Sequence, residues 1–239
     1  MFRLLKALPL TLALAALSFF AASCGSGSQA QIRVVHAISD GPALDIDVNT
    51  TKVFTNISFT GVQPTPPAYT KVASGGDTLQ AVDTGTTTVV IANTSASLSG
   101  SSQYTVVMTG FLNGQGATAP TFYTIPDNNA APTSGNVEFR IIDASANTPI
   151  GGFDVYIVQD PNQLGTAAVS GLTLGQASGY QSVAASTWWL VVTPHGNQTP
   201  DINPRSYPLT AGMIRTLVIV DNTNGGGISQ IPLELSDLN

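Results

Sequence analysis

The chain has 239 residues and a formal net charge of −6, and only 9% of its residues are charged against 43% that are hydrophobic. The few Lys and Arg residues are scattered, whereas nucleic-acid binding uses clusters of them to replace phosphate counterions. This composition argues against a nucleic-acid partner. A single cysteine cannot form an internal disulfide, so core burial must stabilise the fold, and the length suffices for two domains of ordinary size.

The N-terminus has the layout of a secretory signal peptide. Arg3 and Lys6 precede an apolar run at 7–20, and small residues follow at 21–23. The run is at the lower edge of the roughly 20 apolar residues that a membrane-spanning helix needs. We therefore predict a lipoprotein signal peptide over residues 1–23, and hence export.

Cys24, the only cysteine, directly follows the small residues. This arrangement resembles the bacterial lipobox, whose cysteine is acylated and exposed by cleavage. The resemblance implies a lipidated N-terminus and spacer at 24–30 and a membrane anchor through Cys24, with Gly25 favouring the outer membrane, facing the periplasm or the cell surface. Ala21 departs from the Leu that the lipobox prefers, so cleavage without lipidation is the alternative, and an incidental thiol is another.

Short β-branched or aromatic runs predict strands throughout the rest of the chain. In chain order these lie at 32–36, 44–48, 87–91, 104–108, 137–142, 153–158, 188–192 and 216–220. Gly, Pro, Asn and Ser clusters separate them, and no sustained 3.6-residue apolar period follows the leader. The pattern predicts an all-β protein made of immunoglobulin-like or Greek-key β-sandwiches.

An internal repeat predicts two tandem domains. The segment 33–37 resembles 140–144, and the spacing between the two is that of a whole domain. The alignment continues through Asp45 with Asp154, Tyr69 with Tyr180, and Thr105 with Thr216. We predict a first sandwich over 31–126, a linker rich in turn-forming residues over 127–136, and a second sandwich over 137–239.

The opening strand and turn carry a family resemblance. Segment 33–37 reads Arg-Val-Val-His-Ala, and 39–42 reads Ser-Asp-Gly-Pro. These residues resemble the opening of the bacterial domain of unknown function 4397 family, and the repeat implies two tandem copies. In the second copy Asp143 replaces His36. The resemblance implies an exported, often lipid-anchored sandwich, and it brings no known activity and no catalytic residues.

Carboxylates near the first turn are the candidate acid, base or metal-binding groups. Strand alternation places Asp45 and Asp47 on one face, and Asp40 lies in the preceding turn. With His36 they would make a metal-dependent binder or hydrolase, which is the alternative function. A solvated strand face explains the same pattern.

The two histidines do not predict catalysis, since His36 and His195 lack the neighbouring residues of a zinc site or a hydrolase motif. We expect His36 to fix the following turn and His195 to lie in a loop. The sequence therefore predicts no enzyme activity, no metal and no cofactor.

The pair Trp188-Trp189 is the remaining candidate contact site. Alternation predicts that Trp188 points inward and Trp189 outward, where Tyr156 extends the patch. We expect Trp189 and Tyr156 to contact a partner or the other domain. The functional prediction is a non-enzymatic envelope module for binding, adhesion or structure, whose partner is an envelope glycan, an envelope protein or a second copy of the chain.

Overall fold

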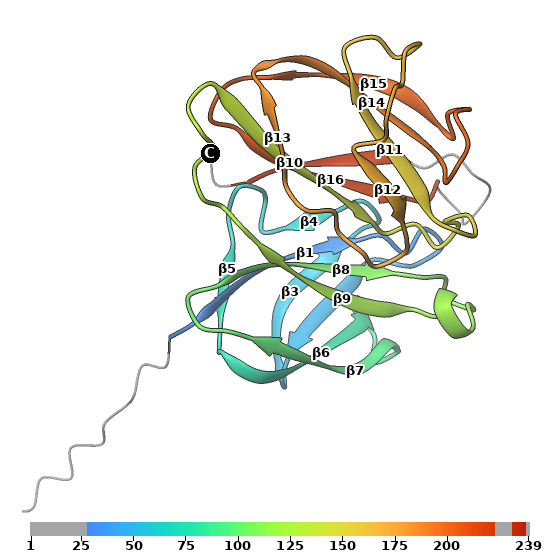
Figure 1. The fold of residues 1–239 in the computed structure, drawn as a ribbon. Helices are drawn as coiled ribbons and strands as arrows, with labels where there is room; N and C mark the ends of the chain where they lie inside the picture. The colour runs from blue at the N-terminus through green and yellow to red at the C-terminus, as the bar shows by residue number, and fades with distance from the viewer. Residues whose placement is uncertain (1–27, 223–230, 238–239) are drawn as a thin grey trace, which may run out of the picture.

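The computed structural model describes residues 28–222 and 231–237, which are built almost entirely of β-strands (Figure 1). The predicted all-β class is confirmed. Within the described part the helical structure is one 3-10 turn, η1 (Gly116–Thr118), and no helix there is long and apolar enough to span a membrane. The leader predicted at 1–23 and the anchor Cys24 lie outside the described residues.

The N-terminal half contains two sheets. One has the strand order β4-β1-β8-β9, with β5 also pairing with β1, and the other has the order β3-β2-β6-β7. The strands are β1 (Ala30–His36), β2 (Leu44–Val48), β3 (Thr51–Ile57), β4 (Val62–Gln63), β5 (Thr70–Val72), β6 (Gly75–Asp83), β7 (Val89–Leu98), β8 (Gln103–Thr109) and β9 (Thr121–Asp127).

The C-terminal half contains two further sheets, with the orders β13-β10-β16-β17 and β12-β11-β14-β15. The strands are β10 (Asn136–Asp143), β11 (Phe153–Val158), β12 (Val169–Leu172), β13 (Gln181–Ala184), β14 (Ser186–Pro194), β15 (Ile202–Leu209), β16 (Ile214–Val220) and β17 (Ile231–Ser236). In each half the first strand runs parallel to the penultimate one, β1 to β8 and β10 to β16. The two halves therefore share one topology, and their immunoglobulin-like or Greek-key classification stays a prediction.

Three apolar clusters hold four sheets in a stack. One cluster fills the N-terminal half, a second fills the C-terminal half, and a third lies between the sheets that contain β1 and β10. We call these two facing sheets the inner sheets, the other two the outer sheets, and the contact between the inner sheets the seam. Figure 1 shows the halves packed against each other at the seam.

The alternation of β1 explains how it serves two clusters. Ile32 and Val34 belong to the core of the N-terminal half, whereas Val35 and Ala37 belong to the seam cluster. Both faces of the inner sheet are thus covered, which accounts for the nearly continuous apolar run in this strand.

The connection between the halves is the segment 128–135. Because β9 ends at Asp127 and β10 begins at Asn136, both ends of the linker predicted at 127–136 belong to strands. Asp127 in particular lies at the seam, where its side chain is fully buried.

Candidate functional site

The predicted carboxylate site is divided among structural contacts. Asp45 is 4% exposed and lies on β2, where it accepts hydrogen bonds from Lys52 Nζ (2.6 Å) and Thr84 Oγ1 (2.8 Å) and from the backbone N–H of Asn56 (2.9 Å). Burial opposes ionisation of Asp45, but these bonds outweigh it and hold its pKa below the usual value. Asp45 thus ties together three segments of the N-terminal half.

Asp40 and His36 make separate contacts. Asp40 accepts a hydrogen bond from the backbone N–H of Leu112 (3.0 Å), which joins the first turn to the loop after β8. His36 is fully buried, and its Nε2 lies 2.9 Å from the carbonyl oxygen of Pro42. Burial lowers the pKa of His36, with the bond to Pro42 opposing this effect. The described residues contain no group of three or more His, Cys, Asp or Glu side chains arranged for a metal ion, so Asp40, Asp45, Asp47 and His36 do not converge there.

A Ser, His and Asp do converge in the C-terminal half. Asp154 Oδ1 lies 2.9 Å from His195 Nδ1 and accepts a hydrogen bond from Ser170 Oγ (2.7 Å). Ser170 Oγ is also 3.3 Å from the same Nδ1, whereas a nucleophilic triad places serine and aspartate on opposite ring nitrogens. Asp154 also accepts hydrogen bonds from the backbone N–H groups of Gly171 and Gly196. The cluster therefore holds loops together rather than activating the serine.

The structure places Asp154 at the position of Asp45 in the repeat, and both carboxylates perform the same task. Burial opposes ionisation of Asp154, but its bonds from His195, Gly196 and Ser170 prevail and hold its pKa well below the usual value. The sequence alignment had paired these two aspartates without indicating that each is a buried tie between loops.

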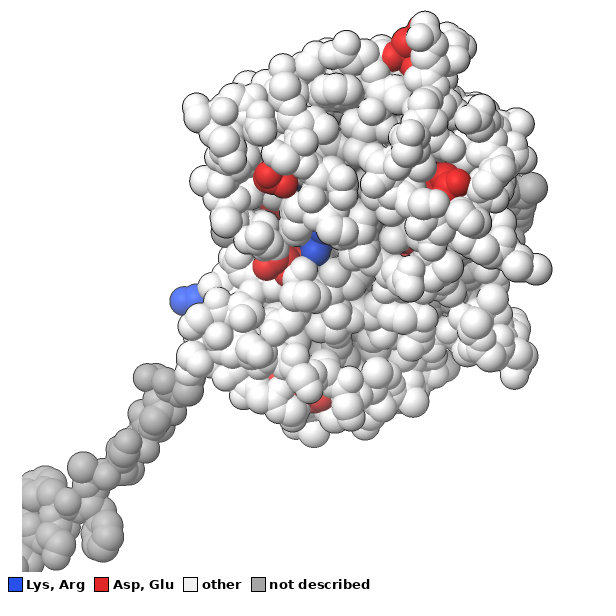
Figure 2. Space-filling view, viewed as in Figure 1, with Lys and Arg blue, Asp and Glu red and all other residues white. Residues whose placement is uncertain are grey.

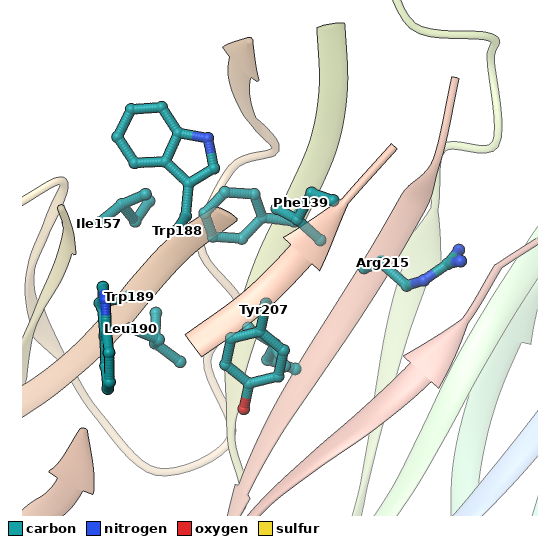
Figure 3. Close-up of a pocket in the computed structure, with 9 residues that line it drawn as sticks. Phe139, Ile157, Trp188, Trp189, Leu190, Tyr207 and Arg215 are labelled. Carbon is teal, nitrogen blue, oxygen red and sulfur yellow. The ribbon is translucent and has the colours of Figure 1, made fainter. Parts of the chain in front are cut away.

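The tryptophan pair lies on β14 in the outer sheet of the C-terminal half. Trp188 packs against the core together with Leu190 and Val192, as the alternation predicts. Figure 3 shows Trp188 and Tyr207 beside Phe139 in a narrow apolar pocket, and Trp189 extending in a different direction from Trp188.

The predicted contact residues Trp189 and Tyr156 both lie in this outer sheet, on the far side of the C-terminal core from the seam. Neither belongs to the seam cluster. Tyr156 is only 5% exposed. Contact of Trp189 with an external partner stays a prediction.

Two buried arginines form the most highly charged site in the described part of the chain. Arg33 on β1 donates from Nε to Thr105 Oγ1 (2.9 Å) and from a terminal nitrogen to Asp237 (2.5 Å). Arg140 on β10 donates from Nε to Thr216 Oγ1 (3.1 Å) and forms an ion pair with Asp127. Each arginine therefore bonds a threonine of its own half and pairs with the aspartate of the other half, and Arg33 also lies 3.4 Å from Asp127 of its own half.

Each arginine also lies over a tyrosine of its own half. The guanidinium carbon of Arg33 is 5.1 Å from the ring centroid of Tyr69, and that of Arg140 is 4.9 Å from the ring of Tyr180. Burial alone would lower the pKa of Arg33, but the charges of Asp237 and Asp127 outweigh it and raise that pKa. Figure 2 shows one face of the molecule, which is largely uncharged and carries only scattered acidic and basic side chains. By contrast, Arg33 and Arg140 are buried together at the seam.

We call Arg33, Tyr69, Thr105 and Asp127 the N-terminal quartet, and Arg140, Tyr180, Thr216 and Asp237 the C-terminal quartet. The members occupy matching strands and turns, and the contacts are reciprocal. Sequence reasoning found Arg33 with Arg140, Tyr69 with Tyr180 and Thr105 with Thr216 as repeat matches. It missed their meeting at one place, because the pairing of inner sheets has no local sequence signal.

A second buried acidic group lies beside the seam. Asp143 ends β10 and Asp221 directly follows β16. Both are fully buried, and Ser145 bonds to both of them. Burial raises the pKa of Asp143 to about 7; the bonds from Thr148 and Ser145 oppose this shift, and the nearby charge of Asp221 adds to it. The loop after β10 is therefore held by a pair of carboxylates.

One family model, described as domain of unknown function (DUF4397), matches residues 30–156, which is more than half of the chain. The chain belongs to this family. The match begins at the first residue of β1 and ends within β11, so it covers the N-terminal half, β10 and most of β11. No curated protein matches the chain.

The DUF4397 match divides the two quartets unequally. The whole N-terminal quartet lies inside the matched residues, and so does Arg140. The remaining members of the C-terminal quartet, Tyr180, Thr216 and Asp237, lie beyond them. The residues matched by the family model thus contain one complete quartet and Arg140, which pairs with Asp127 of that quartet.

Proposed function

We propose that this chain is an exported lipoprotein, anchored through Cys24, that acts as a non-enzymatic binding, adhesion or structural module of the cell envelope. The observation that carries the proposal is the lone cysteine, placed directly after an apolar leader and shortly before Ala30, where β1 begins. Such a spacing would leave a short tether between the membrane surface and the folded body.

The packing of the two halves supports a structural or binding role. Apolar side chains and buried ion pairs join the inner sheets, so the halves would move as one body on their tether. A body of this kind keeps the relative orientation of its two outer sheets, which suits a module that presents fixed surfaces to a glycan, a protein or a second copy.

The contacts of the candidate acid and base groups favour a module over an enzyme. Asp45 is occupied by Lys52 and two further donors, Asp40 by a loop backbone, and His36 by a turn carbonyl. A catalytic acid or base needs access to substrate, whereas His36 and Asp45 are buried and all three side chains hold parts of the fold together.

We further infer that the C-terminal half is a second, diverged copy of the family domain. Its strand order repeats that of the N-terminal half, and its quartet matches the N-terminal quartet residue by residue. The divergence lies in the ends of the strands, where Asp143 replaces His36.

The test compares the natively expressed wild type with Cys24→Ser by intact mass, membrane fractionation and protease accessibility on whole cells. We expect the wild type to carry a lipid-sized mass increment and to fractionate with membranes, and the variant to lose both. An unmodified, soluble protein in both samples would refute the anchoring proposal and leave a freely exported module.

A further inference from the structure

We propose that the seam is a self-pairing surface through which two copies of this chain can join by exchanging halves. The proposal specifies the self-association part of the proposed function and does not depend on the lipid anchor. Mass analysis of Cys24→Ser and the experiment below therefore fail independently of each other.

The polar contacts of the seam are reciprocal, as a two-fold interface requires. Arg33 of the N-terminal half pairs with Asp237 of the C-terminal half, and Arg140 of the C-terminal half pairs with Asp127 of the N-terminal half. In an interface between identical faces, a contact from residue i to residue j is matched by one from j to i. The seam has this property even though one chain supplies both faces.

The apolar contacts follow the same rule. The buried members of the seam cluster include four matched pairs, one from each half: Val35 with Ile142, Ala37 with Ala144, Val107 with Val218, and Ile125 with Leu235. Each half therefore contributes nearly the same face, and each face complements the other.

A half that lacks its partner would expose costly groups. The carboxylates of Asp127 and Asp237 and the guanidinium of Arg33 are 0% exposed in the closed seam. Removing the opposite half would break the Arg33–Asp237 and Arg140–Asp127 pairs and leave Arg33 and Asp127 only their 3.4 Å contact with each other. These charged groups would then lie beside an uncovered apolar patch of the kind that drives association. A chain whose own halves cannot meet would thus be driven to recruit the matching half of another chain.

The connection between the halves decides which partner is used. Segment 128–135 links β9 in one inner sheet to β10 in the facing one. Facing sheets are about 10 Å apart, whereas directly bonded residues are about 3.8 Å apart. Deleting 128–135 joins Asp127 directly to Asn136, and a single chain can then no longer close its own seam.

The experiment measures the molar mass of this deletion variant by light scattering during size-exclusion chromatography. We expect a dimer with twice the chain mass, while a matched control with 128–135 replaced by Gly and Ser residues of equal number stays monomeric. A deletion variant that remains a folded monomer, or one that forms only irregular aggregates, would overturn the proposal.

Charge exchange makes the test specific to the seam. In the deletion background, Arg33→Asp opposes Asp237, and Asp237→Arg opposes Arg33, so neither variant should dimerise well alone. Mixing them by co-refolding restores an opposite-charge pair at both seams of a heterodimer, and we expect at least a tenfold gain in dimer over either variant alone. Equal dimerisation of all three samples would show that another surface joins the chains.

Discussion

The two halves of this protein share strand order and seam residues, but they differ at the ends of their strands. The N-terminal half ends β1 with His36, which is bonded to a turn carbonyl, whereas the C-terminal half ends β10 with Asp143 beside a second buried carboxylate. The outer sheets differ as well. Asp77 on β6 of the N-terminal half is bonded to Asn49, whereas Trp188 on β14, the matching strand of the C-terminal half, lines an apolar pocket.

This difference shows which positions the architecture requires. The polar residues that face the other half keep their identity, as the arginine, threonine, tyrosine and aspartate of each quartet do. The apolar seam positions keep their apolar character, with Val35 matched by Ile142 and Ile125 by Leu235. Residues at the ends of the strands contact local loops, so residues of different types can hold those loops in the two halves. The predictions below test this distinction, starting with the seam.

The largest expected effect comes from Asp127→Ala. The substitution leaves Arg140 buried without its ion-pair partner, and breaking a buried pair in this way costs about 3–5 kcal/mol of the free energy of unfolding. Asp237→Ala should cost less, because Asp127 also accepts a hydrogen bond from Tyr69 and lies 3.4 Å from Arg33, whereas the described partners of the Asp237 carboxylate are Arg33 and Thr216. Urea denaturation measures both.

Asp160→Ala is the matched control for these substitutions, since Asp160 lies in an exposed turn where its partners are Asn162 and Gln163. Its effect should stay within about 0.5 kcal/mol. Equal losses for the seam and control variants would refute the distinction between seam and loop positions.

An intermediate, pH-dependent effect is expected for Asp143→Asn. Because burial raises the pKa of Asp143 from 3.8 to about 7, the folded state holds a proton that the unfolded state releases. Its contribution to stability is fully present below pH about 4 and is lost as the pH rises through about 7, a change on the order of 4 kcal/mol.

Asp143→Asn removes this titration and keeps an oxygen for the bond from the Ser145 backbone. The wild type should therefore lose stability relative to the variant between pH 4 and pH 8 in urea titrations. A constant difference between the two proteins across that range would contradict the assignment. His36→Asn, at the matching position of the first half, should not reproduce this dependence.

The smallest effect is expected for Lys52→Ala. The side chain of Lys52 is 49% exposed, and exposed ion pairs contribute about 0–1 kcal/mol. Asp45→Ala should cost more, since it also removes the acceptor of the Asn56 backbone and Thr84. Thermal unfolding of both variants compares them, and a larger loss for Lys52→Ala would contradict the role assigned to Asp45.

Several features of the fold could be predicted from the sequence because their signals are local. The apolar strands β1, β2, β8, β10, β11, β14 and β16 all overlap predicted runs. The edge strand β7 also overlaps a predicted run, whereas the inner strand β6 was missed. Other edge strands were missed because their residues are polar or include proline, as in β15, whose segment reads Ile-Asn-Pro-Arg-Ser-Tyr-Pro-Leu. An edge strand needs fewer apolar side chains and can leave a backbone N–H unpaired.

The candidate site was harder to predict. Arg33 and Arg140 were visible only as repeat matches, since an arginine inside an apolar strand does not indicate which carboxylate it meets. Asp127 was placed in a linker and Asp237 near the end of the chain, where the sequence shows no sign of burial. The roles of these four residues depend on how the two inner sheets pack against each other. The residue pattern within a single strand carries no information about that packing.

The central claim is that reciprocal ion pairs couple the two halves across the seam. A double-mutant cycle on Arg33→Met and Asp237→Leu, measured as free energies of unfolding in urea, tests it most directly. We predict a coupling energy of about 1–3 kcal/mol, since contacting residues in one buried network are non-additive. Additive effects of the two substitutions would contradict the claim, because they would show that the Arg33–Asp237 pair does not couple the halves.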